Sequence, residues 1–183
     1  TMKEPITEMV LEAPGGLVQV RAHCADGKAQ RIEVENLPSF VSLQNVPLEI
    51  ENEGTIFVDT AFGGDSFVII DPASLGLSLN LDEAQALSEL GVKITNAANA
   101  QLRFIHPSRP EWRHHSFCLF AGELKRDAKG ISAKSIVSIQ PGKLDRSPTG
   151  TAVSARMALL HAKGELKVGE RLTGVSIIGS EFY

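Results

Sequence analysis

The chain has 183 residues, with 18 Lys and Arg against 22 Asp and Glu, so its formal net charge is −4. Hydrophobic residues make up 43% of the sequence, with 16 Gly and 9 Pro, which is typical of globular domains and excludes collagen-like, disordered and coiled-coil proteins. The mild acidic excess gives no electrostatic reason to expect binding to nucleic acid or to an anionic membrane.

The composition also bears on the cellular compartment. The longest apolar runs, such as residues 66–70, are far shorter than the roughly 20 residues that a membrane-spanning helix needs. No basic and then apolar leader opens the sequence, so we expect no signal peptide. Two cysteines are too few for a disulfide framework and favour a reducing compartment. These features predict a cytoplasmic protein.

The first part of the chain is expected to form antiparallel strands. A strand at residues 6–13 precedes the alternating apolar and polar residues of 17–24. Asp26 and Gly27 are typical of a tight hairpin turn, after which residues 31–35 alternate again. Further strands are expected at residues 39–43, 47–51, 55–60 and 67–70.

The middle of the chain changes to helical periodicity. Apolar residues recur every three or four positions from Asp82 through Leu87 to Ala97, and Asn80 is suited to cap this helix. Before it, Gly63 and Gly64 mark a bend where the backbone approaches a ligand or another strand closely. After it, strands are expected at residues 102–106, 116–120, 135–139 and 175–178.

A second helix is predicted from residue 151 to residue 163, with Gly164 just after its end. It is small or apolar on nearly every side, which is typical of a helix inside a fold. The patterns together predict the α+β class. We expect a single domain over residues 1–183, in which a mainly antiparallel sheet curves around this buried helix.

Residues 145–151, which lead into the second helix, carry the clearest chemistry. The unpaired N–H groups and partial positive charge of a helix N-terminus favour an anion. A carboxylate could bind the N–H groups of Gly150 and Thr151, and Asp145 could pair with an ammonium group, so the segment suits an amino acid. The alternative is that Asp145 and Ser147 are only caps and Gly150 is only a turn residue.

The same segment is similar to a known motif. The sequences DRSPTGT at 145–151, SARMA at 154–158 and AKG at 162–164 resemble the second active-site motif of the proline racemase superfamily. This superfamily includes hydroxyproline 2-epimerases and trans-3-hydroxy-L-proline dehydratases. Further agreement follows in family order at residues 12–18, 35–40, 59–64, 106–107 and 176–179.

The resemblance implies one half of a two-domain enzyme with a diaminopimelate epimerase-like fold that needs no cofactor. In the family, the site lies between the halves, and each half supplies one acid/base residue from the N-terminus of its central helix. The first half carries a Met-Cys-Gly-His motif, which is absent from this sequence. Residues 1–183 are therefore expected to be the second domain, with the missing first domain as partner and little activity alone. A natural short form is the alternative.

Thr149 stands where the resemblance places the second catalytic cysteine. Racemases and epimerases need a base on each face of the α-carbon. A Thr hydroxyl is too weak an acid to exchange a proton near neutral pH, whereas a thiol at a helix N-terminus can be made more acidic. One base can still remove the α-proton, and a substrate with a 3-hydroxyl then loses water.

The resemblance therefore favours a trans-3-hydroxy-L-proline dehydratase that forms Δ1-pyrroline-2-carboxylate. Thr149 would pack or hydrogen-bond near the leaving hydroxyl. Asp145 would hold the ring nitrogen, and Gly150 and Thr151 would bind the carboxylate. The alternatives are a fragment of a 4-hydroxyproline epimerase or proline racemase, and a non-catalytic module that binds an amino acid or pairs with itself through its exposed cleft face.

The remaining candidate residues have simpler interpretations. Cys24 and Cys118 are expected to be small core residues. His114 and His115 lack an acidic or Cys partner at ligand spacing, so no metal is expected; His115 could instead reach a substrate hydroxyl. His161 is expected to be a core histidine, Arg156 to pair structurally, and Asp65 to line the cleft or to form a turn.

Overall fold

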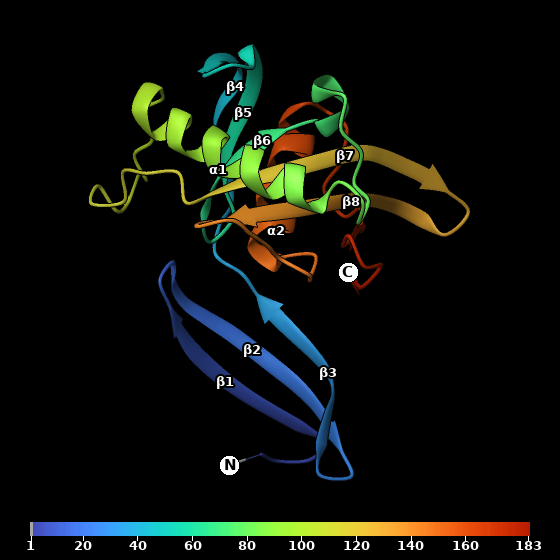
Figure 1. Ribbon diagram of the computed structural model, residues 1–183. Helices are drawn as coiled ribbons and strands as arrows, with labels where there is room; N and C mark the ends of the chain where they lie inside the picture. Colours follow the sequence, from blue (N-terminus) through green and yellow to red (C-terminus); the bar gives the residue numbers. More distant parts are fainter. Residues whose placement is uncertain (1) are drawn as a thin grey trace. The chain divides into compact units, whose positions relative to one another are not determined.

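The computed structural model describes residues 2–183 (Figure 1). Its residues group into two compact units, Thr1–Pro38 and Ser39–Tyr183. The sequence predicted a single domain over 1–183, because strand-like alternation continues through this boundary without a linker-like segment. The two units are described separately.

The first unit is a three-stranded antiparallel sheet in the order β1-β2-β3. Its strands are β1 (Ile6–Ala13), β2 (Gly16–Ala25) and β3 (Lys28–Glu35). Asp26 and Gly27, which join β2 to β3, have φ angles of 52° and 70°. Positive φ at both central residues is what a type I′ hairpin turn requires, so the predicted turn is confirmed.

The two faces of this sheet differ in chemistry. In the central strand, Val20, Ala22 and Cys24 are buried. The opposite face carries an ion pair between Arg21 and Glu8, 2.9 Å apart, and a contact of 3.2 Å between His23 and Glu33. The alternation seen in the sequence thus separates an apolar face from a charged one.

The second unit contains a mixed sheet whose strands follow the order β11-β10-β8-β7-β6-β5-β4, with β9 paired to β8. The pairs β6–β7 and β8–β10 are parallel, and the others are antiparallel, so the sheet is mainly antiparallel as predicted. The strands are β4 (Phe40–Ile50), β5 (Gly54–Phe62), β6 (Ser66–Ile70), β7 (Phe117–Asp127), β8 (Gly130–Ile139), β9 (Lys143–Leu144), β10 (Leu172–Val175) and β11 (Glu181–Phe182).

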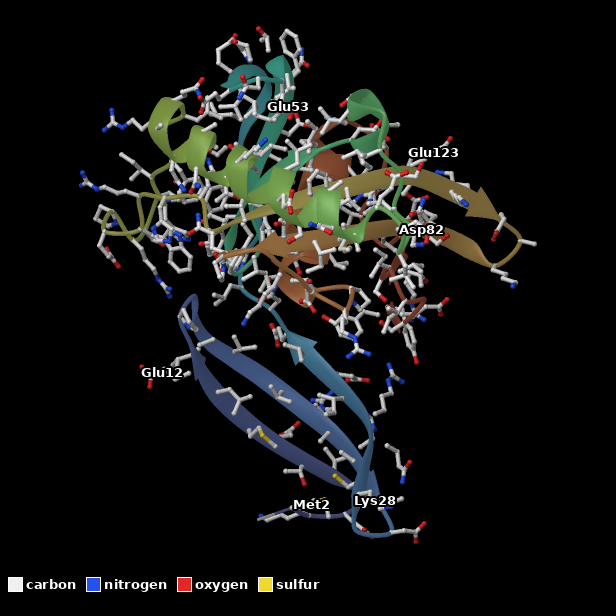
Figure 2. All side chains as sticks on the ribbon, in the orientation of Figure 1. Met2, Glu12, Lys28, Glu53, Asp82 and Glu123 are labelled. Carbon is white, nitrogen blue, oxygen red and sulfur yellow. The ribbon has the colours of Figure 1, made fainter. Side chains whose placement is uncertain are left out.

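Two helices cover the two faces of this sheet, α1 (Ala84–Gln101) and α2 (Gly150–Ala162) (Figure 1). Every residue of β6 is buried, because successive side chains point to opposite faces and each face is covered. Val68 packs with the α1 residues, and Ile69 packs with the α2 residues. Figure 2 shows Glu53 in the turn after β4, where its carboxylate lies 3.7 Å from Lys93 of α1.

The expectation that the sheet curves around a helix buried on all sides is not supported. Helix α2 buries one side, formed by Ala152, Ala155, Arg156, Leu159 and Leu160, whereas His161 on the same helix is exposed. Small residues such as Ala152 and Ala155 let α2 lie close to the sheet, so an apolar sequence does not require burial all round.

Most element positions agree with the sequence, with local differences. Helix α2 and its end at Gly164 (φ 75°) are confirmed. Helix α1 begins two residues after Asp82; Asn80 accepts the Glu83 N–H at 3.0 Å in the turn before it. The strand predicted at 102–106 is wrong, since this segment is irregular apart from one isolated bridge between His106 and Arg109.

Other predicted strands have different bounds in the structure. The predicted strands at 39–43 and 47–51 form the single strand β4, whose register with β5 shifts at two places. The strand predicted at 175–178 ends at Val175 in the structure, as β10. No helix of the described residues combines the length and apolar character needed to cross a membrane.

Candidate functional site

The loop that leads into α2 is anchored to the sheet. The N–H of Asp145 donates to the carbonyl of Val137 in β8 at 2.9 Å, and Pro148 is buried. A Cβ added to Gly174 of β10 would lie 2.6 Å from Val153 Cγ2, so the glycine lets this strand lie directly against a side chain of the first turn of α2. The sheet therefore fixes where α2 begins.

Within the loop, Asp145, Ser147 and Thr149 form a local hydrogen-bond network. The Asp145 carboxylate accepts the Ser147 N–H at 2.9 Å through Oδ1 and the Thr149 hydroxyl at 2.6 Å through Oδ2. The Ser147 hydroxyl oxygen accepts the Thr149 N–H at 3.1 Å. Asp145 and Ser147 therefore organise the loop, but they are not helix caps, because α2 is capped at Thr149 and no side chain of residues 2–183 makes a capping hydrogen bond there.

Thr149 is held in an uncommon backbone conformation. Its φ of 59° and ψ of 95° lie outside the regions that β-branched residues normally occupy. Such a conformation costs on the order of 1–3 kcal/mol and persists only where the surroundings enforce it. The hydrogen bonds to the N–H and hydroxyl of Thr149 supply that enforcement.

The first turn of α2 offers N–H groups to an anion. The carbonyl of Thr149 accepts the Val153 N–H at 2.9 Å, so the N–H groups of Gly150, Thr151 and Ala152 come before the first N–H that donates within the helix. Within residues 2–183, these three N–H groups have no hydrogen-bond partner. Gly150 is exposed, and a Cβ added there would meet no atom within 4 Å. The first residue of α2 therefore faces open space, whereas Ala152 is fully buried.

The structure thus brings together the four residues singled out in the sequence. Asp145, Thr149, Gly150 and Thr151 lie on one loop and the helix turn that follows it, with a carboxylate and a row of N–H donors side by side. This arrangement can hold a ligand that carries both a positive and a negative group. The roles assigned to the individual residues stay predictions.

The turn between β5 and β6 packs against α2. Gly63 donates its N–H to the carbonyl of Asp65 at 2.9 Å. A Cβ added to Gly63 would lie 2.9 Å from Ala155 Cα and closer still to Thr151 O and Ala155 N. The close approach expected from the glycine pair is therefore an approach to the helix.

Asp65 has partners in its own turn. Its Oδ1 accepts the Ser66 N–H at 2.8 Å. Burial raises the pKa of the Asp65 carboxyl, opposed by hydrogen bonds from Ser116 and Ser66 and by the charge of His114. These contacts favour the turn role over a role in lining a cleft.

His115 is enclosed in the fold beneath α1. Its side chain is 1% exposed, it packs on Phe104, and neither ring nitrogen has a hydrogen-bond partner among the described residues. Its backbone N–H and carbonyl both bind the side chain of Asn99. Burial lowers the pKa of His115 to about 4, with a smaller contribution from His114. A ring in this position does not reach a ligand on the surface.

The other candidates are structural. Cys118 is fully buried, which raises the pKa of its thiol, and Cys24 is buried too, so both predictions are confirmed. Arg156 donates to the carbonyls of Lys134, at 3.0 Å, and Gly122, and burial lowers the pKa of its guanidinium to about 10. The prediction for His161 is wrong, because it is exposed on α2.

No cluster of three potential metal ligands occurs in residues 2–183. Ser147 was predicted only as a cap, and its bond to the Thr149 N–H was not predicted. The Ser-Pro-Thr spacing, with a serine two residues before the position of positive φ, is the signal that could have indicated it.

The sequence model described as Proline racemase matches residues 1–183. The chain belongs to the proline racemase family. The structure is similar to a hydroxyproline epimerase from Agrobacterium vitis with bound trans-4-hydroxy-L-proline, at 34% identity and a TM-score of 0.89. It is equally similar to a probable proline racemase from Agrobacterium radiobacter K84 with bound carbonate, at 34% identity and a TM-score of 0.89.

Both similarities cover 99% of this chain but only 51% and 52% of those proteins. The chain thus spans about half the length of these proline racemase relatives. The expected site loop lies in the matched region.

Proposed function

We propose that this chain supplies one side of the substrate site of a cofactor-independent hydroxyproline enzyme, and that the reaction is dehydration of trans-3-hydroxy-L-proline. In this proposal the N–H groups of Gly150 and Thr151 bind the substrate carboxylate, Asp145 pairs with the ring nitrogen, and Thr149 lies beside the 3-hydroxyl. A relative with bound trans-4-hydroxy-L-proline supports the substrate class.

The observation that carries the proposal is the nature of position 149. Its hydroxyl donates to the Asp145 carboxylate at 2.6 Å. The two cysteines, Cys24 and Cys118, are both buried, and neither belongs to residues 145–151, the loop that precedes α2. This half of the site therefore offers no thiol to exchange a proton with the α-carbon. Because inversion needs a base on each face, the absence of one here favours chemistry that uses a single base.

Elimination of water satisfies that condition. A base from the other half of the site, a region that we propose completes the cleft, removes the α-proton. The electron pair of the broken Cα–H bond forms a Cα–Cβ double bond as the bond between Cβ and the 3-hydroxyl oxygen breaks. The hydroxyl leaves as water with the proton that the base has removed, so the base is regenerated. The enamine product tautomerises to Δ1-pyrroline-2-carboxylate. The role of α2 is to bind the carboxylate as negative charge develops next to it.

Epimerisation of 4-hydroxyproline or racemisation of proline is the second candidate, since the similar solved proteins are described as a hydroxyproline epimerase and a probable proline racemase. It requires that a group other than Thr149 protonate the face that α2 covers.

Reaction in D₂O separates the two candidates. The longest natural polypeptide that contains this chain is incubated with trans-3-hydroxy-L-proline and, separately, with trans-4-hydroxy-L-proline. We expect imine, trapped with o-aminobenzaldehyde, from the first and no inverted product from the second. Inversion of the α-carbon with deuterium incorporation would exclude the single-base proposal. The 183-residue chain alone serves as a matched control and is expected to form imine at least about a hundredfold more slowly, since one acid/base group is worth 10²–10⁴ in rate.

A further inference from the structure

We propose that Asp145 is a positioning residue for Thr149. By accepting the hydroxyl proton of Thr149, it leaves the Thr149 hydroxyl oxygen to face the ligand as a hydrogen-bond acceptor. The part of this inference that concerns the ligand rests on the proposed function. The part that concerns the loop does not.

Every polar atom of Thr149 is engaged. Its N–H donates to Ser147 Oγ at 3.1 Å, its carbonyl accepts from Val153 N at 2.9 Å, and its hydroxyl donates to Asp145 Oδ2 at 2.6 Å. A carboxylate has no proton to give, so the hydroxyl proton of Thr149 points toward Asp145. The hydroxyl oxygen then has only lone pairs left to offer.

The second oxygen of the same carboxylate holds Asp145 in place. Asp145 Oδ1 accepts the Ser147 N–H at 2.9 Å, and a backbone N–H cannot reverse its role. The carboxylate is therefore held at both ends while Thr149 is held at φ 59°. Without the carboxylate, the Thr149 side chain would be free to rotate, and the unfavourable backbone conformation of Thr149 would lose one of the bonds that hold it.

The consequence is a preference for a ligand group that donates. A hydroxyl on the ring can donate to Thr149, whereas an ether oxygen at the same carbon cannot. The site is thus suited to hydroxylated cyclic amino acids over their O-alkyl analogues. It follows that the proton that leaves with the 3-hydroxyl comes from a group other than Thr149.

The loop arm of the test needs no ligand. Three-bond couplings to the Thr149 methyl carbon report its χ1 rotamer by NMR in the 183-residue chain. We expect one rotamer in the wild-type chain and rotamer averaging in Asp145→Ala. The matched control is Asp127→Asn, which removes an equal charge from an exposed turn where Asp127 accepts the Lys129 N–H, and it should leave the Thr149 couplings unchanged. A single unchanged rotamer in Asp145→Ala would overturn the positioning role.

Asp145→Asn gives a sharper result. The Asn oxygen must face the Ser147 N–H, so its NH₂ group faces Thr149 and donates to it. The rotamer of Thr149 should then be kept, but its hydroxyl proton becomes free to face the ligand. This variant separates the polarity of the bond from the position of the side chain.

The ligand arm compares trans-3-hydroxy-L-proline with its 3-O-methyl ether, by chemical-shift titration. We expect the wild-type chain to bind the alcohol at least fivefold more tightly. The ratio should fall to about one in Thr149→Val and in Asp145→Asn, and should be retained in Thr149→Ser. A ratio that survives in Thr149→Val, or in Asp145→Asn, would overturn the inference. Failure of the wild-type chain to bind either compound would count against the proposed function and the ligand part, while the rotamer result still decides the role of Asp145.

Discussion

Replacing Gly63 by Ala places a methyl group against the backbone of α2. The added Cβ would lie 2.9 Å from Ala155 Cα, whereas ordinary contact begins at 3.4 Å, and it would be closer still to Thr151 O and Ala155 N. These two backbone atoms are four residues apart on the helix and cannot rotate away as a side chain can. Helix and turn must therefore separate by roughly 1 Å, a distance at which packed atoms lose a quarter to a half of their attraction.

The separation would loosen the contacts of Ala152, Ala155 and Leu159 with the sheet. We expect a loss of about 3 kcal/mol in the free energy of unfolding, at the upper end of the range for overpacked sites, because both partners are backbone. For a chain of this length that corresponds to a fall in Tm of roughly 6–12 °C. Urea unfolding followed by circular dichroism measures the first quantity, and differential scanning calorimetry the second.

Gly150→Ala is the matched control, since it adds the same methyl group to the first residue of α2, where no atom lies within 4 Å. Ala is favoured over Gly in a helix, so this variant should change stability by less than about 1 kcal/mol, in the stabilising direction. If Gly63→Ala unfolds within about 0.5 kcal/mol of the wild-type chain, the close approach of the turn to α2 does not exist in solution.

Three further predictions concern buried and charged groups. The pKa of His115, about 4, lies below the ordinary value of about 6.5. As the pH drops from about 6.5 to about 4, the unfolded chain therefore binds a proton that the folded chain does not, and the free energy of unfolding falls. In urea midpoints measured against pH, His115→Leu should show a smaller fall over this range. Arg156→Leu leaves the carbonyls of Lys134 and Gly122 without their donor and should cost about 3 kcal/mol in urea unfolding, whereas Arg156→Lys should cost less. Asp145→Ala should weaken binding of pyrrole-2-carboxylate, a planar analogue of the deprotonated substrate, at least tenfold by titration calorimetry; unchanged affinity would exclude Asp145 from the ligand site.

Local chemistry made parts of the fold predictable. The Asp26-Gly27 turn follows from residues that tolerate positive φ, and the end of α2 follows from Gly164. The segment 102–106 shows the opposite case. Its alternation is real, since Phe104 and His106 are buried and pack on Phe40, but its hydrogen bonds do not form a ladder. Alternation indicates which side chains are buried, but a strand also needs an adjacent strand with which its backbone can form hydrogen bonds.

The candidate site, like the fold, was predictable from the sequence only in part. The motif in residues 145–151 located the loop, the helix N-terminus and the four residues of interest. The positive φ of Thr149 and its bond to Asp145 were not predictable, because a threonine has no local preference for that conformation. They arise from the bonds that Asp145 and Ser147 make to Thr149 in a loop whose start is anchored to β8.

Strand β4 lies at one end of the sheet order and is among the longest strands of the fold. A long edge invites other chains to add a strand and so to aggregate. Its two register shifts with β5, the positive φ of Asn45 and the presence of Pro47 interrupt the regular row of donors and acceptors that such growth requires. The irregularities of β4 thus protect this edge of the sheet against edge-to-edge assembly, and idealising the strand would be expected to promote aggregation.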